Sequence, residues 1–146
     1  MADPRISPDG SRVVYTVSEI HAATNTRPAD LWLVAAAGGP ARQLTFLPAN
    51  DTRPRWSPDG RAIAFLSDRE GVGEGGTPVE KRAQVWLLDA SGGEARQLTR
   101  SATPVTDFAW SPDGRALVYV ADALPADHAA REARRKDGFD EVVVGD

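Results

Sequence analysis

The 146-residue sequence contains no cysteine, one methionine and only two histidines. The absence of cysteine excludes disulfides and thiol chemistry, although it does not separate a cytoplasmic from a periplasmic protein. No apolar run approaches the roughly 20 residues of a membrane-spanning helix. The net charge is −4, with both signs mixed along the chain, so no basic face is available for nucleic acid. We therefore expect neither a membrane nor a nucleic acid as a partner.

Motifs for catalysis and cofactor binding are also missing. No Gly-x-Ser-x-Gly elbow occurs, and His21 and His128 stand in expected connections without a neighbouring nucleophile. Residues 71–76 match Gly-x-Gly-x-x-Gly in form, but a strand is expected after them where a pyrophosphate site needs a helix. The acidic residues of the same loop lack the spacing of an EF-hand. We expect no catalytic residue, no cofactor and no metal site in this chain.

What the sequence has instead is repetition. Trp-Ser-Pro-Asp-Gly occurs twice and Ile-Ser-Pro-Asp-Gly once, with the serines 50 and 54 positions apart, while Arg-Gln-Leu-Thr recurs after 54 positions. Two phrases that recur in one order at one period indicate a repeated supersecondary unit. Because a catalytic group is needed only once, we assign the first phrase a structural role. Its residues are Ser7, Pro8, Asp9, Gly10, Trp56, Ser57, Pro58, Asp59, Gly60, Trp110, Ser111, Pro112, Asp113 and Gly114.

Each unit is expected to contain four antiparallel strands. Ser-Pro-Asp-Gly has the residues of a tight turn, and an apolar run follows it, with Tyr15, Phe65 or Tyr119 five positions after the turn glycine. These runs are apolar on both faces, so we expect both faces to be buried. A third strand carries Trp32 or Trp86, and a Gly-Gly turn leads to a fourth that ends in Arg-Gln-Leu-Thr. Such a unit is typical of a propeller blade, although the Gly-His and Trp-Asp pairs of WD repeats are absent.

The sequence therefore predicts an all-β fold, a partial β-propeller of four-stranded antiparallel blades over residues 1–146. We expect blade one at about 1–46, blade two at about 50–100 and an incomplete blade three at about 104–146. Propellers close with roughly four to eight blades. About two and a half blades are present, so we expect the chain to be a fragment cut inside its third blade. No leader follows the initial methionine, and any targeting signal would lie upstream.

One short helix is expected at about 127–137. Asp127 is a possible N-cap, Glu132 and Lys136 form an i,i+4 pair, and Gly138 can close the C-terminus. We expect this helix as an insertion between the second and third strands of blade three.

Two arginines are candidates for a functional role. Arg53 and Arg55 flank Pro54 on the expected innermost strand of blade two, where a propeller lines its central channel. They could attract a substrate carboxylate, or they could be rim residues paired with local acids, which we favour. The chain opens abruptly, and residues 3–6 leave little room for the innermost strand of blade one. We expect the four tryptophans in the packing within or between blades.

The Trp-Ser-Pro-Asp-Gly-Arg turn, the strand after it, the Val-Trp-Leu-Leu-Asp strand and Gly-Gly-Glu-Ala-Arg-Gln-Leu-Thr together resemble TolB-type propeller repeats. Such repeats occur in periplasmic TolB and in the N-terminal propeller of prolyl oligopeptidase-family serine peptidases. The opening, residues 2–17, is similar to the first blade of acylaminoacyl-peptidase-like members. In those enzymes the propeller caps a C-terminal α/β-hydrolase domain with a Ser-Asp-His triad and restricts entry to short or unfolded peptides.

This resemblance implies a non-catalytic propeller segment that gates access to, and scaffolds, a hydrolase domain outside this chain. The parent protein would be a serine-type exopeptidase or oligopeptidase, and the expected partners are that catalytic domain and a peptide substrate. The alternative is a TolB-like propeller that binds other proteins. Unpaired strand edges predict that the isolated fragment self-associates. The compartment stays open between cytoplasm and periplasm, in a bacterial source.

Overall fold

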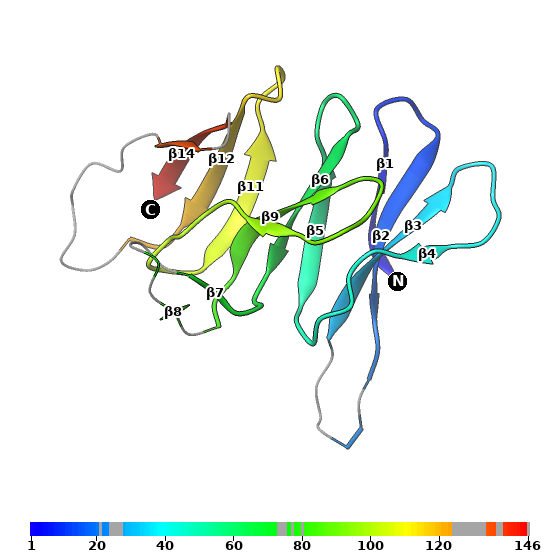
Figure 1. The fold of residues 1–146 in the computed structure, drawn as a ribbon, viewed down its shortest axis with the longest axis horizontal. Helices are drawn as coiled ribbons and strands as arrows, with labels where there is room; N and C mark the ends of the chain where they lie inside the picture. The colour runs from blue at the N-terminus through cyan, green and yellow to red at the C-terminus, as the bar shows by residue number, and fades with distance from the viewer. Residues whose placement is uncertain are drawn as a thin grey trace.

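The computed structural model describes residues 1–20, 22–23, 28–72, 76, 78–79, 81–123, 134–136 and 139–145. Its strands form three four-stranded sheets and one small two-stranded sheet. The three larger sheets stand side by side in sequence order (Figure 1). None of the described residues is in an α-helix, so the predicted all-β, partial-propeller fold is confirmed.

The first two blades are antiparallel meanders in which each strand pairs with the next along the sheet. Blade one has the order β1-β2-β3-β4 and blade two the order β5-β6-β9-β10, while β7 and β8 form a separate hairpin. The strand bounds are β1 Ala2–Ile6, β2 Arg12–Ser18, β3 Ala29–Ala35, β4 Arg42–Gln43, β5 Asp51–Trp56, β6 Ala62–Ser67, β7 Gly71–Val72, β8 Pro78–Val79, β9 Gln84–Asp89 and β10 Arg96–Gln97. The strand β1 corrects the expectation that the chain opens too abruptly for an innermost strand.

Aromatic cross-strand pairs fix the same register in both blades. Tyr15 on β2 lies opposite Trp32 on β3, and Phe65 on β6 lies opposite Trp86 on β9. Directly opposed aromatic side chains stabilise a pair of strands, and a slip by one residue would turn each of them to the other face of its sheet. The regular spacing of the aromatic residues in the sequence therefore reflects the register of strand pairing within each blade.

The Arg-Gln-Leu-Thr phrase anchors the outermost strand to the third strand. The hydroxyl of Thr45 accepts a 2.9 Å hydrogen bond from the Leu31 main-chain N–H, and the hydroxyl of Thr99 accepts one of 2.8 Å from Val85. A threonine side chain here replaces a main-chain acceptor where β4 and β10 end. This satisfies N–H groups that would otherwise be buried without a partner.

The third sheet departs from the expected meander. Its strands are β11 Val105–Trp110, β12 Ala116–Ala121, β13 Arg134–Lys136 and β14 Phe139–Gly145, in the order β11-β12-β14-β13. β14 runs parallel to β12, with Val143 opposite Tyr119, the place that Trp32 and Trp86 take in the first two blades. The β-branched run in β14 favours a strand, but such a run carries no information about the direction of pairing.

The expected helix at 127–137 is wrong where it can be judged. Residues 124–133 and 137–138, which include Asp127, Glu132 and Gly138, lie outside the described residues. Arg134–Lys136 form β13, which pairs with β14 in an antiparallel hairpin. An i,i+4 ion pair stabilises a helix by only about 0.2–0.5 kcal/mol, so strand pairing decides the structure of this segment.

The core consists of two clusters, one between blades one and two and the other between blades two and three. Blade two contributes to both, so β6 and β9 are buried along almost their whole length. β2 and β12 instead alternate between buried and half-buried residues, because one face of each has no described blade against it. The expectation that all three runs are buried on both faces is therefore correct only for blade two.

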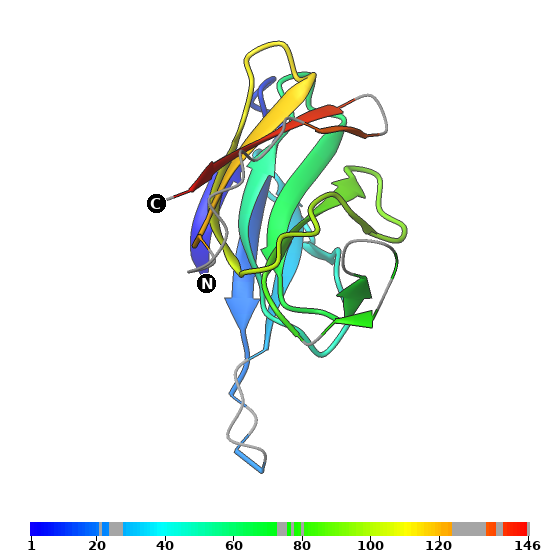
Figure 2. The same cartoon turned by 90° about the vertical axis from the view of Figure 1, so that its left-hand side faces the viewer.

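The tryptophans lie in this packing. Trp56 and Trp86 are each 9% exposed and belong to the first cluster, and Trp110 packs against the second. Trp32 is half-buried. The predicted place of Trp56, Trp86 and Trp110 is confirmed. Turned by 90°, the three sheets overlap as a stack (Figure 2), which is the arrangement that these two clusters hold together.

Candidate functional site

The innermost strand of each blade contains an irregularity at an equivalent place. Asp3 in β1 and Arg53 in β5 adopt φ of 49° and 51°, a region that is uncommon for residues other than glycine and is better tolerated by aspartate than by arginine. Bulges of this kind bend a strand and redirect its side chains. The register shifts lie between Ala2 and Arg5, between Thr52 and Arg55, and between Val105 and Asp107.

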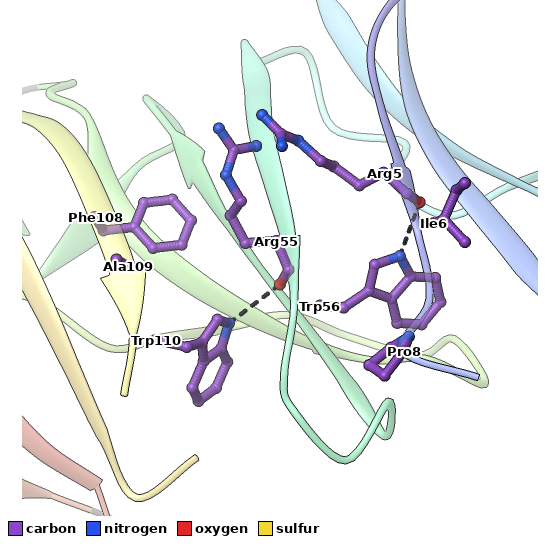
Figure 3. A pocket seen from close by; sticks show the side chains of 8 residues that line it. All are labelled: Arg5, Ile6, Pro8, Arg55, Trp56, Phe108, Ala109 and Trp110. Carbon is purple, nitrogen blue, oxygen red and sulfur yellow. Dashed lines mark hydrogen bonds between the residues drawn. The ribbon is translucent and has the colours of Figure 1, made fainter. Parts of the chain in front are cut away.

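After the irregularities in β1 and β5, a main-chain carbonyl accepts a bond from the tryptophan of the following blade. The indole N–H of Trp56 donates to the carbonyl of Arg5 at 2.9 Å, and that of Trp110 donates to the carbonyl of Arg55 at 3.2 Å (Figure 3). Arg5 and Arg55 are equivalent residues of successive blades, 50 positions apart. The tryptophan of the repeated phrase therefore connects each innermost strand to the one before it.

Asp3 joins two guanidinium groups from different blades. Its carboxylate oxygens accept 3.0 Å bonds from Nε of Arg5 and from Nη1 of Arg55. Partial burial raises the pKa of Asp3, but the hydrogen bonds and charges of Arg55 and then Arg5 outweigh this, and the pKa lies below its ordinary value. Asp3 is therefore ionised at neutral pH, and the three groups together carry a charge of about +1.

Arg53 has a different environment. Its Nη1 lies 3.4 Å from the carboxylate of Asp107, and the two side chains are 47% and 58% exposed. An exposed pair of this kind contributes little because solvent and salt screen it. The two arginines that the sequence treats alike are thus distinct, since Arg53 pairs with an acid of blade three and Arg55 with an acid of blade one.

A groove of about 320 Å³ crosses the innermost strands of all three blades. Its residues lie on β1, β5 and β11, or in the turn after β1, and Figure 3 shows the guanidinium groups of Arg5 and Arg55 close together on one side of it. The other lining residues are apolar. The complete lining is Arg5, Ile6, Pro8, Arg55, Trp56, Phe108, Ala109 and Trp110. The groove thus combines two cations with an apolar wall, and Arg53 is not part of it.

The turns that follow the innermost strands use their polar groups internally. The hydroxyl of Ser57 donates a 2.6 Å bond to Asp59 and accepts one of 3.0 Å from the Ala62 N–H. The same bonds recur at Ser7 and Ser111. The bond from the serine hydroxyl is the main reason that the pKa values of the turn aspartates lie below the ordinary value. A serine held in this way is not free to act as a nucleophile.

These turns also set the spacing between blades. Gly60 has a φ of 72°, and a Cβ at this position would meet Cδ of Pro8 in the preceding turn at 3.5 Å. Gly114 packs in the same way on Pro58. A glycine is needed here because its positive φ is costly for other residues. Proline and glycine of the repeated phrase therefore contact one another across successive blades.

The described residues contain no group of three or more His, Cys, Asp or Glu side chains placed to hold a metal ion. Among those same residues, no helix is long and apolar enough to span a membrane. Of the residues singled out in the sequence, the structure brings Pro8, Arg55, Trp56 and Trp110 together at the groove and leaves Arg53 outside it.

Asp3 and Arg5 were not identified from the sequence. A signal for them was present, because Asp3-Pro4-Arg5 occupies the same place before the repeated phrase as Arg53-Pro54-Arg55, 50 positions later. The contact between Asp3 and Arg55 could not be deduced, since it depends on how neighbouring blades are placed.

Three successive four-stranded sheets, connected through their innermost strands, define a segment of a β-propeller. Residues 1–122 match the family described as the TolB beta propeller domain, and the chain belongs to that family. The chain is 32% identical over 145 residues to the uncharacterized peptidase YuxL of Bacillus subtilis strain 168, covering 99% of this chain and 21% of that protein. It is 33% identical over 117 residues to dipeptidyl-peptidase 5 of Porphyromonas endodontalis, covering 80% of this chain and 16% of that protein.

A solved structure of TolB from Acinetobacter baumannii superposes with a TM-score of 0.59 at 26% identity, over 80% of this chain and 25% of that one. Both peptidases and TolB therefore contain segments like this one. The chain spans about a fifth or less of the length of the two peptidases.

Proposed function

We propose that this chain is part of a propeller that scaffolds an α/β-hydrolase serine peptidase domain of the same protein and gates the access of peptides to it. The observation that carries the proposal is the 32% identity to a peptidase along 99% of the chain, which accounts for only 21% of that peptidase. Propeller sequence of this kind is thus joined to a much longer chain in a relative named as a peptidase.

The contacts of the repeated phrase support a role as scaffold. All three motif serines donate hydrogen bonds to aspartates of their own turns. The hydroxyl groups that could be taken for nucleophiles therefore have structural partners. Acyl transfer needs a nucleophile, a base and an oxyanion site in one geometry. We propose that these groups belong to the other domain, and that this chain alone has no hydrolytic activity.

The connections between blades support a role as gate. A filter by size works only if the wall of its channel keeps its shape, and the bonds from Trp56 and Trp110 fix the innermost strands to one another. We propose that substrates must pass this wall, so that access limits the size of the substrate while the chemistry happens elsewhere.

The test uses the complete protein that contains this chain and a series of blocked peptides of increasing length, ending with a folded protein. We expect kcat/KM to fall steeply with size. The variant Trp56→Phe, which removes the indole N–H together with part of the ring, should keep kcat for the shortest peptide and relax the limit on longer ones. Trp32→Phe is the matched control, because Trp32 lies opposite Tyr15 within its own blade. Equal size selectivity in all three proteins would reject gating, and turnover by the 146-residue chain alone would reject the scaffold role.

A second candidate is a TolB-like propeller that binds other proteins without catalysis. It is favoured by the superposition on TolB at 26% identity. The two proposals differ in the residues that follow this chain in its gene: a Gly-x-Ser-x-Gly motif several hundred residues downstream supports the peptidase, and a stop after the last blade supports the binding protein.

A further inference from the structure

We infer that the groove across β1, β5 and β11 binds the C-terminal carboxylate of a peptide whose last side chain is large and apolar. The site consists of Arg5 and Arg55, which take the carboxylate, and of the apolar wall formed with Trp56, Phe108 and Trp110. This inference rests on the proposed function only in naming a peptide as the ligand.

The guanidinium groups have donors to spare. Arg5 uses Nε for Asp3, and Arg55 uses Nη1 for Asp3 and for the carbonyl of Pro54. Among the described residues, no hydrogen bond uses the Nη1 and Nη2 groups of Arg5 or Nε and Nη2 of Arg55. A guanidinium has five N–H donors in a planar fork that fits a carboxylate. Two such forks side by side can therefore hold a second carboxylate beside Asp3.

The charge of the site also favours an anion. Two cations share one acid, and the groove lining itself contains no acidic residue. Arg55 is only 23% exposed, so solvent screens its charge less than it screens the charge of Arg53, which is 47% exposed. An incoming carboxylate would balance the remaining positive charge.

The apolar wall determines which terminal side chain can bind together with the carboxylate. Trp56 and Phe108 present little surface, at 9% and 5% exposed, but Ile6 is 67% exposed, and Trp110 is half-buried. The volume of about 320 Å³ is at the lower end of the roughly 300–1,000 Å³ found for small-ligand sites. It suits one terminal residue and its neighbour, with an aromatic or large aliphatic side chain against Ile6 and Trp110.

The experiment measures binding directly, by calorimetry on the complete protein, with acetyl-Ala-Phe as the probe. Chromatography after the titration verifies that the probe is intact, so that the result does not depend on any activity. Three further compounds serve as controls. The C-terminal amide of acetyl-Ala-Phe has no carboxylate, and the C-terminal amide of acetyl-Glu-Phe has only a side-chain carboxylate. Acetate has a carboxylate but no peptide. We expect the free acid alone to bind well, with the three other compounds weaker by about tenfold or more, as the loss of charge-assisted hydrogen bonds predicts.

Three single variants locate the site. Arg55→Gln should weaken the binding of acetyl-Ala-Phe by about tenfold. Arg53→Gln, a matched change on the same strand outside the groove, should change the affinity by no more than about twofold. Asp3→Asn removes the competing carboxylate at a position with φ of 49°, which asparagine accommodates. It should tighten binding, a gain that a purely structural role of Asp3 does not predict.

The inference is overturned if the amide or acetate binds as well as the free acid, or if Arg53→Gln and Arg55→Gln weaken binding equally. Absence of tightening in a folded Asp3→Asn protein would also count against it. A protein that binds the probe as expected but shows no size limit in turnover would retain this site and lose the gating proposal.

Discussion

The indole N–H of Trp56 lies 2.9 Å from the main-chain carbonyl of Arg5, on the innermost strand of the preceding blade. The same ring is covered by the guanidinium of Arg12, 4.8 Å from its centroid, and Arg12 also donates a 3.0 Å bond to the carbonyl of Gly60. Blade one thus holds this tryptophan by its edge and by its face. Trp110 makes the first of these contacts with Arg55, but alanine replaces arginine at the position in blade two that matches Arg12.

Trp56→Phe should lower the free energy of unfolding by about 1 kcal/mol for the lost hydrogen bond, and further because the smaller ring leaves space in the packing. Trp56→Ala should cost about 3–5 kcal/mol, because a large buried side chain is lost as well. Urea unfolding followed by far-UV circular dichroism measures both. Trp32→Phe, a half-buried ring without a described bond to another blade, is the control and should cost less. Equal costs for the two phenylalanine variants would contradict the role given to the bond.

The ion pair of Asp51 and Arg69 is buried, with side chains 0% and 8% exposed and a separation of 2.7 Å. Arg69 also lies over the rings of Phe65 and Trp86. Arg69→Met should destabilise the fold by about 3–5 kcal/mol, since Asp51 would keep a buried charge without its partner. The double variant Asp51→Asn with Arg69→Met should lose clearly less than the sum of the single changes. Additive losses in urea unfolding would show that the two charges are not coupled.

Asp30 should destabilise the fold at neutral pH. Burial, and then the negative charge of Asp51, raise the pKa of Asp30 above the ordinary value of 3.8. A group whose pKa is raised on folding contributes stability below its unfolded pKa, and this contribution is lost as the pH rises through the folded value. Asp30→Asn should therefore be more stable than the natural protein at pH 7, and the advantage should disappear towards pH 3. The turn aspartates, whose pKa values are lowered, titrate in both proteins and cancel in the difference.

A constant difference in unfolding free energy between pH 3 and pH 7 would mean that Asp30 has no raised pKa. Thr45→Val, which removes the hydroxyl that donates to Asp30 at 3.4 Å, should raise the pKa of Asp30 further and steepen the pH dependence.

The isolated 146-residue chain should self-associate. Val13, Tyr15 and Val17 lie on one face of β2 and are half-buried although no described blade packs on them. Phe46 is 73% exposed and Leu47 is 51% exposed. Apolar faces of this kind associate, and sedimentation velocity should show a concentration-dependent increase in mass. Val13→Lys with Val17→Lys should reduce it more than Phe46→Lys with Leu47→Lys, if the face of the blade is the contact. A stable monomer at high concentration would contradict the prediction.

The sequence predicted what is local and repeated. The turn chemistry of Ser57 to Gly60, the strands on either side and the register of Phe65 against Trp86 depend on residues close in the chain, and these follow the pattern. The direction of β14 depends on pairing between distant segments, and strand propensity is the same in both directions. The helix predicted for Lys136 was wrong because weak local preferences compete there with a strand partner.

The candidate site was predicted in part. Arg53 and Arg55 were singled out together by their place on either side of Pro54 on the innermost strand. An ideal strand alternates and would put both side chains on one face. The irregularity between Thr52 and Arg55 breaks that alternation, and the local residue types do not predict it. Asp3 was missed for the same reason: its partner Arg55 is 52 positions away and is reached only through the packing of two blades.

The acceptors of the two tryptophan bonds are main-chain carbonyls. The bond that connects each blade to the preceding one therefore does not depend on the side chain of the accepting residue. The chain itself contains variation at this place, since the equivalent positions in successive blades are Arg5, Arg55 and Ala109. Substitutions facing the groove can accordingly accumulate, and ligand preference can diverge among proteins of this architecture, without changing how the blades are attached.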